Sequence, residues 1–329
     1  GVDGVTGQRL WLSLFGAASV AATGVLAWRL SGGRSAPAMV AAGIAAVHPL
    51  WFQSDATLMP ETLAALLGAG VVAAAVDAVR RPSLRTSIVL GAACGLAALT
   101  RGEALLLVPA VAVPAAVVGG VPRARWKAAA VPLLAAAVVV APWTIRNAMR
   151  FAEPVPISTN IASVIDGANC RSTYAGDLLG YWQYADDCFQ GFTQPELAFL
   201  DDESLVADEH RHQGQSFAFD NIDDWPEVVL ARLGRTIAVF RPDQLADLAA
   251  LEGREQGAEL VGYALLWATL ALGAVGAMRL RRAGLPWWIP VSAVATVWGS
   301  TALTYGNPRF LAVAHPSIAA LAACGVTRR

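Results

Sequence analysis

The sequence has few charged residues, and this scarcity argues against an ordinary soluble domain. Of its 329 residues, 15% are charged and 56% are hydrophobic, whereas soluble domains contain about 25% charged residues. The acids are also unevenly placed, since residues 151–259 contain 20 of the 25 Asp and Glu residues. Long stretches nearly free of charge on either side of that region are typical of a protein that crosses a membrane several times.

Several functional motifs are absent as well. No basic stripe indicates nucleic-acid binding, and Lys127 is the only lysine among 24 basic residues. The chain has no glycine-rich phosphate loop, HExxH, paired CxxC or serine elbow, which excludes the common nucleotide, zinc-protease and hydrolase sites. His210 and His212 are two residues apart and do not share a helix face, so no metal site is predicted.

Cysteine is rare, and its four copies fall into two pairs. Cys94 and Cys324 lie in apolar segments and are predicted to be small, inert hydrophobic residues. Cys170 and Cys188 both lie in the acidic region. If that region is outside the cell, a disulfide between them is a candidate. Two free thiols are the alternative, because a sequence does not show whether two Cβ atoms meet.

The apolar residues group into nine segments. The pattern predicts an all-α polytopic membrane protein with about nine transmembrane helices and one large extracytoplasmic loop that contains interfacial helices. Several segments are shorter than the ~20 residues of a straight span, so 86–100 and 103–120 are candidates for kinked or partly inserted helices. The segments are 10–28, 36–50, 60–79, 86–100, 103–120, 128–143, 258–278, 285–305 and 308–326.

Arginine-rich connections set the predicted orientation. They follow the first, third, fifth, seventh and ninth segments, so all five fall on one side, which the positive-inside rule makes the cytoplasm. Residues 1–143 then form six helices, residues 144–257 form the extracytoplasmic loop, and residues 258–329 form three more helices. The predicted location is the cell (plasma) membrane, with the active side extracytoplasmic.

The loop carries two helical patterns of its own. One runs from about Pro195 to Asn221, and the other begins at Trp225-Pro226-Glu227, with proline in the first turn. In the second, apolar residues alternate with Arg232 and Arg235, which favours a helix in the membrane interface. A helix packed on the loop's own small core is the alternative.

Charged residues cluster where the segments meet the outer side, and such residues are functional candidates because charge is costly at membrane depth. Glu61 opens the third segment, so its alternative role is a helix start favoured by the dipole. Asp55 is a weaker candidate, because a short outer loop often carries a solvated acid. Arg101 suits an anionic phosphate, with an Arg101–Glu103 surface pair or a snorkelling arginine as the alternative; Glu103 is a weaker candidate.

Two further clusters complete the set. Arg146 and Asn147 follow Trp143, an expected interfacial anchor, and Arg146 either binds a headgroup or ends a helix. Arg309 begins the last segment with no acid near it in the sequence, so it needs a partner, for which a lipid phosphate is suited. All four clusters are predicted to converge on one outward-facing cavity.

Taken in order, these motifs resemble the C-fold (GT-C) membrane glycosyltransferases. The likeness is to the branch of dolichyl-phosphate-mannose protein mannosyltransferases and bacterial aminoarabinose transferases, glycosyltransferase family 39. The resembling parts are Pro49 and Glu61, residues 95–101, 142–147, 156–160, 218–242 and 306–310, and His315 with Pro316.

The resemblance implies a function and partners. It implies inverting transfer of a sugar from a polyprenyl-phosphate donor to a protein, lipid or glycan acceptor on the outer face of the bilayer. A carboxylate acts as base, while arginine and sometimes a divalent metal stabilise the leaving phosphate. The family's catalytic acid follows its first span, and this chain is expected to lack that span and loop. We therefore expect the base upstream of Gly1 and the fragment to be inactive. A transporter or flippase of a lipid-linked substrate and a non-catalytic scaffold are the alternatives.

Overall fold

The computed structural model describes residues 4–120, 125–184, 188 and 202–327, and every regular element within these ranges is a helix. The longer helices are α1 (Val5–Leu30), α2 (Ser35–Val47), α4 (Glu61–Arg80), α5 (Leu84–Thr100), α7 (Arg125–Arg150), α11 (Glu203–Asp220), α12 (Trp225–Thr236), α14 (Gln256–Arg282), α15 (Trp288–Ser300) and α16 (His315–Val326). The shorter ones are α3 (Pro49–Phe52), η1 (Gln53–Ala56), η2 (Gly102–Leu106), η3 (Val108–Ala112), α6 (Val113–Gly119), α8 (Asn160–Ala168), α9 (Arg171–Tyr174), η5 (Gly176–Leu178), η6 (Ile222–Asp224), α13 (Pro242–Leu251), η7 (Thr301–Leu303) and η8 (Pro308–Ala314). Part of the predicted helix from Pro195 lies outside the described residues.

The chain divides into two compact units. Unit 1 comprises residues 1–139, 242–297 and 309–329, and unit 2 comprises residues 140–241 and 298–308. The predicted three-part division by membrane side stays a prediction, because these units reflect packing and not membrane side.

Six helices are long and apolar enough to cross a membrane in the described part of the chain, or seven if one bent pair counts as a span. The bent pair joins α2 to α3 and η1 at an angle of 62°. Two of the nine predicted segments form shorter apolar helices, Leu84–Thr100 and Trp288–Leu303. The all-helical, polytopic fold is confirmed, whereas the number of nine spans stays a prediction.

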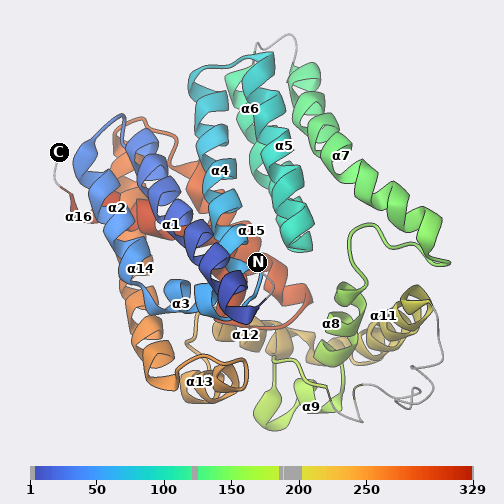
Figure 1. Ribbon diagram of the computed structural model, residues 1–329. Coiled ribbons are helices and arrows are strands. Elements are labelled where there is room, and N and C mark those ends of the chain that lie inside the picture. Colours follow the sequence, from blue (N-terminus) through green and yellow to red (C-terminus); the bar gives the residue numbers. More distant parts are fainter. Residues whose placement is uncertain (1–3, 121–124, 185–187, 189–201, 328–329) are drawn as a thin grey trace. The chain divides into compact units, whose positions relative to one another are not determined.

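Basic side chains gather at one end of unit 1. Arg80 donates to the carbonyl oxygens of Arg29 and Leu30 at the end of α1, and Arg29 pairs with Asp77. Cations near a helix C-terminus satisfy its unpaired carbonyls and oppose the helix dipole. Figure 1 shows the turns that join α1 to α2 and α4 to α5 at this same end. The bend between α2 and η1 and the start of α4 lie at the other end.

Glycine allows close contacts between the helices of unit 1. A Cβ at Gly68 of α4 would lie 2.0 Å from the carbonyl oxygen of Val313. A Cβ at Gly276 of α14 would lie 1.9 Å from the carbonyl oxygen of Leu321 in α16. Small residues let helix backbones approach in this way inside membranes. The contact at Gly68 matters for function because it positions the segment that carries Arg309.

We expect Gly68→Ala to lower the melting temperature of the purified protein in detergent. The added methyl group meets backbone and not a flexible side chain, and overpacking of this kind costs about 1–3 kcal/mol. Gly70 of the same helix is exposed, with open space around its Cα, so Gly70→Ala is the matched control. Alanine is preferred to glycine in a helix, so the control should melt at or above the wild-type temperature. Equal melting of the two variants would contradict the packing described.

Unit 2 has a core of its own. Val228 and Ala231 of α12 pack with Tyr174 and Leu179. Trp225 begins α12 with proline next to it, as predicted. The two arginines of α12 lie on its buried face, whereas Leu230 is 70% exposed. The predicted position of α12 in the membrane interface stays a prediction, but the helix does pack on the core of this unit.

The buried arginines of unit 2 bond to backbone. Arg232 donates to the carbonyl oxygen of Ala168 at 2.6 Å, and Arg235 donates to that of Leu179 at 2.7 Å. Burial lowers the pKa of Arg235 to about 10. Nearby in this unit, Asp166 and His210 form a buried pair at 2.7 Å, and burial raises the pKa of Asp166. These contacts fix α8, η5 and α12 together.

A disulfide joins Cys170 and Cys188, whose Cα atoms lie 4.9 Å apart, while Cys94 and Cys324 are free and buried.

We expect a thiol reagent to label two of the four cysteines in the denatured, unreduced protein, and all four after reduction. The bridge closes a loop of about 18 residues, so its loss should destabilise unit 2 by about 3 kcal/mol. Labelling of four thiols before reduction would refute the bridge.

Candidate functional site

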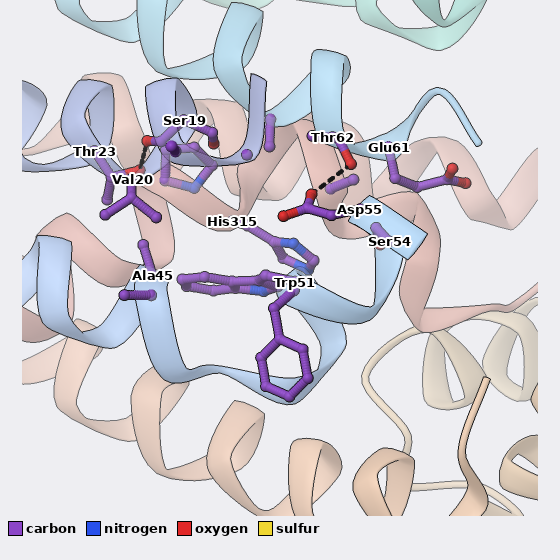
Figure 2. Close-up of a pocket in the computed structure, with 17 residues that line it drawn as sticks. Ser19, Val20, Thr23, Ala45, Trp51, Ser54, Asp55, Glu61, Thr62 and His315 are labelled. Carbon is purple, nitrogen blue, oxygen red and sulfur yellow. Dashed lines mark hydrogen bonds between the residues drawn. The ribbon is translucent and has the colours of Figure 1, made fainter. Parts of the chain in front are cut away.

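A cavity of about 360 Å³ lies among α1, the α2–η1 bend, the start of α4, η8 and α16 in unit 1. One part of its wall is apolar and formed by small residues. The other part presents hydroxyl, carboxylate and aromatic groups (Figure 2). The polar and aromatic lining residues are Ser19, Thr23, Trp51, Phe52, Ser54, Asp55, Glu61, Thr62 and His315. Cavities of ~300–1,000 Å³ are typical of small-ligand sites.

Asp55 presents the carboxylate of this cavity. Its Oδ1 accepts a hydrogen bond of 2.8 Å from the Thr62 hydroxyl, and Figure 2 shows the two side chains facing each other. A Cβ at Gly16 would lie 2.1 Å from Oδ2 of Asp55, so glycine is required where α1 passes. The carboxylate is therefore held by α1 and α4 from opposite sides.

Three aromatic rings form a stack along one wall. His48 and Trp51 have ring centroids 4.5 Å apart, and Trp51 and His315 have centroids 4.7 Å apart. Both imidazoles are buried. Within the described residues, both ring nitrogens of His48 and Nε2 of His315 have no hydrogen-bond partner. The stack therefore fixes the α2–α3 break against the start of α16 through ring contacts and not through hydrogen bonds.

Glu61 connects the cavity to a group of ion pairs. It borders the cavity, and its side chain extends away from the Trp51–His315 stack (Figure 2). Its Oε1 accepts a hydrogen bond of 2.8 Å from Arg101 and lies 3.8 Å from Nε of Arg309. Its Oε2 is buried and has no partner among the described residues. The guanidinium of Arg101 also pairs with Glu103 and lies over the ring of Phe310, 4.8 Å from its centroid.

The ion pairs continue beyond Arg309. Arg309 donates to Glu252 at 2.8 Å, and Oε2 of Glu252 lies 3.9 Å from Arg254. Arg254 in turn donates to Glu259 at 3.3 Å. Gln53 closes this end, since it donates to Glu259 and accepts from the backbone N–H of residue 255. We call this set the arginine network: Gln53, Glu61, Arg101, Glu103, Glu252, Arg254, Glu259 and Arg309.

The carboxylates of the arginine network differ in exposure. Glu61 and Glu259 have side chains only 2% exposed, whereas Glu103 and Glu252 are 22% and 23% exposed. Buried ion pairs need further hydrogen bonds to offset desolvation, and both buried carboxylates have a second partner: Glu61 contacts Arg101 and Arg309, and Glu259 contacts Arg254 and Gln53. Glu61 and Glu259 therefore hold the arginines in place.

The carboxylates near the cavity do not form a metal site. Asp55 is engaged by Thr62, and Glu61 is engaged by Arg101. Within the described ranges, no group of three or more His, Cys, Asp or Glu side chains is placed to hold a metal ion.

Five of the seven predicted site residues lie together in unit 1. Asp55, Glu61, Arg101, Glu103 and Arg309 lie in unit 1, at the cavity or in the arginine network. The predicted Arg101–Glu103 pair is present, and it coexists with the pair to Glu61.

Arg146 and Asn147 lie in unit 2, where they have local partners. Asn147 donates to the carbonyl oxygen of Val155 at 3.1 Å and accepts from Arg146 at 3.0 Å. Arg146 also lies over the ring of Trp143. Their predicted role in binding the donor stays a prediction.

Four members of the arginine network were not among the predicted site residues: Gln53, Glu252, Arg254 and Glu259. Glu259 had a usable signal, because it lies in the first turn of an apolar helix, where an acid is either a dipole partner or the partner of a distant cation. The partner of Arg309 was expected to be a lipid phosphate, but Arg309 pairs with Glu61 and Glu252. These acids are remote in the sequence, so only the fold could reveal them.

Residues 5–145 match the family model described as dolichyl-phosphate-mannose-protein mannosyltransferase. The predicted likeness to C-fold membrane glycosyltransferases is thereby confirmed. The matched residues include Asp55, Glu61, Arg101 and Glu103, and the match supports a membrane glycosyltransferase of this type. Comparison with curated proteins and with solved structures found no match.

Proposed function

We propose that this membrane glycosyltransferase moves a sugar from a polyprenyl-phosphate donor to an acceptor on the outer face of the cell membrane, with inversion. The family match supports a lipid-linked donor in a membrane. The observation that carries the proposal is the convergence of Arg101 and Arg309 on Glu61, at the border of a cavity that contains Asp55.

In this proposal the arginines hold the donor phosphate. Guanidinium groups bind phosphate oxygens in pairs of parallel hydrogen bonds. Arg101 uses Nε for Glu103 and NH1 for Glu61. Its NH2 can therefore donate to a phosphate oxygen, and Nε can donate as well where the phosphate replaces Glu103. As the bond between the sugar C1 and the phosphate oxygen breaks, the phosphate gains charge, and prepositioned donors stabilise it without reorganisation.

The charge balance of the arginine network shapes how a phosphate binds. The arginine network has four carboxylates and three guanidinium groups. It therefore carries no net positive charge that would attract an anion. A phosphate must instead replace the more exposed carboxylates, Glu103 or Glu252. The buried Glu61 keeps the guanidinium of Arg101 oriented during that exchange.

The sugar is assigned to the cavity. Asp55 can accept hydrogen bonds from sugar hydroxyls, and the hydroxyl oxygens of Ser19, Thr23 and Thr62 offer further acceptor positions. During transfer, the acceptor oxygen bonds to C1 and gives its proton to a carboxylate, and polyprenyl phosphate leaves with the electron pair of the broken bond. We assign no base to these residues.

The test is an assay in liposomes that contain the protein purified from its own membranes and a radiolabelled polyprenyl-phosphate sugar. Transferase activity releases polyprenyl phosphate in step with label appearing on an added membrane extract that supplies acceptors. Movement of intact donor across the bilayer without cleavage would instead indicate a flippase. Neither cleavage nor movement, with donor bound, would indicate a binding protein, and both results would overturn the proposal.

A further inference from the structure

A second cavity in unit 1 lies far from the arginine network and is rich in arginine. Its volume is about 620 Å³, and Arg34, Arg279 and Arg282 line it. Arg282 ends α14, whereas Glu259 lies in the first turn of the same helix. At 1.5 Å per residue these two positions are roughly 35 Å apart. The two cavities therefore lie toward opposite ends of the membrane helices.

The charge of this second cavity is of one sign. Among the described residues that line it there is no acidic side chain. Asp77, the acid of α4 nearest this end in sequence, pairs with Arg29. Arg279 donates to the carbonyl oxygen of Thr327 at 3.2 Å, which ties one guanidinium to the end of α16.

The floor of the cavity is apolar. Leu280, Leu321 and Cys324 form a buried cluster, against which Leu285 and Trp287 pack. Leu280, Leu285 and Cys324 also line the cavity. A cationic rim above an apolar floor suits a ligand with an anionic head and hydrocarbon chains.

Aromatic residues place the rim at the depth of the lipid headgroups. Arg281 lies over the ring of Trp287, 5.5 Å from its centroid. The ring of Trp28 lies about 3.8 Å from the Cβ position of Gly33, in the turn that Arg34 follows. Tryptophan is enriched where a membrane helix meets the headgroup region. Both tryptophans are thus close in sequence to residues that line the cavity, Ser31 and Leu285.

We propose that the cavity lined by Arg34, Arg279 and Arg282 binds the phosphate group of an anionic phospholipid. Basic pockets between transmembrane helices bind anionic lipid headgroups, and arginine binds phosphate through pairs of hydrogen bonds. The first acyl carbons rest on the floor of Leu280 and Leu285. This site is separate from the donor site and does not depend on the proposed transferase function.

The experiment measures thermal unfolding of the full chain purified in a neutral detergent. Short-chain phosphatidylglycerol should raise the melting temperature by about 5 °C, since a ligand that binds only the folded state stabilises it by mass action. Phosphatidylcholine at the same concentration should give no rise. An equal rise with phosphatidylcholine, or with inorganic phosphate alone, would overturn the proposal.

Two matched variants test the arginines. Arg34→Gln/Arg282→Gln should weaken phosphatidylglycerol binding at least tenfold in this titration. Arg81→Gln/Arg85→Gln removes the same charge from side chains outside the cavity, and it should bind as the wild type does. A cavity variant that keeps the wild-type response would overturn the proposal.

A third variant covers the case in which removal of the arginines prevents folding. Thr327→Glu keeps all three arginines and adds a carboxylate at the rim. The phosphatidylglycerol response should be lost in this variant as well. Its retention would show that the stabilisation arises elsewhere.

Discussion

Replacement of Arg101 by glutamine is expected to lower the rate of sugar transfer by about 10²–10³-fold, the cost of removing one preorganised donor from a developing anion. Arg101 forms an ion pair with Glu61, and Glu61 lines the cavity. Glutamine keeps some hydrogen bonding but removes the charge and the planar fork of donors. The measurement is release of polyprenyl phosphate from the donor in liposomes, with the melting temperature as a check on folding.

The matched control for Arg101→Gln is Glu103→Gln. It removes the charge of Glu103, the more exposed of the two carboxylates that pair with Arg101. If a phosphate replaces Glu103 on the guanidinium, this variant should keep its activity and bind the donor at lower concentration. Loss of activity in Glu103→Gln equal to that in Arg101→Gln would mean that the pair itself is needed. Full activity in a folded Arg101→Gln variant would remove Arg101 from the site.

The second large effect is expected from Glu259→Gln, which should destabilise the protein by about 3–5 kcal/mol. Glu259 accepts from both Arg254 and Gln53, and the Arg254 side chain is only 3% exposed. Removal of the carboxylate charge leaves a buried guanidinium with too little compensation. Nε and NH2 of Arg254 already have no hydrogen-bond partner among the described residues. The melting temperature in detergent measures the loss.

Asp77→Asn is the control for Glu259→Gln, because it makes the same change of charge and shape at a pair that is about one-third exposed. The Arg29 and Asp77 side chains are 34% and 38% exposed, and ion pairs of this kind contribute about 0–1 kcal/mol. The control should therefore melt within a few degrees of the wild type. Equal destabilisation by the two substitutions would mean that burial of the ion pair does not determine how much it contributes to stability.

The arginine network also explains how charge is tolerated near the ends of the membrane helices. Each arginine pairs with two carboxylates. Arg101 also lies over the ring of Phe310. Such sharing satisfies several donors of a guanidinium at once. It also couples the α4 start, the α5–η2 turn and the segment that begins with Arg309. A change at one member should thus alter the positions of the others, and double variants within the network should not be additive.

The sequence predicted the helices of unit 1 well because their cause is local. A run of apolar residues must satisfy its own backbone within a bilayer, so its length and its charged ends can be recognised without knowing its neighbours. The start of α12 at Trp225 and Pro226 was predictable for a similar reason, since proline lacks the N–H that a helix interior needs. The basic end of unit 1 was equally readable from the arginines of alternate connections.

Tertiary structure decided which charges meet. Arg309 had no acid near it in the sequence, yet the fold places it against Glu252 and Glu61, and it brings Trp51 between two histidines. It also buried Arg232 and Arg235, and the sequence pattern had left open whether their helix lies in the membrane interface or packs on the loop's own core. The sequence by itself determined the helical, membrane-spanning character, because burial of apolar surface and backbone satisfaction act segment by segment. The composition of the site required the fold, because ring contacts and ion pairs join residues as distant in the sequence as Trp51 and His315 or Glu61 and Arg309.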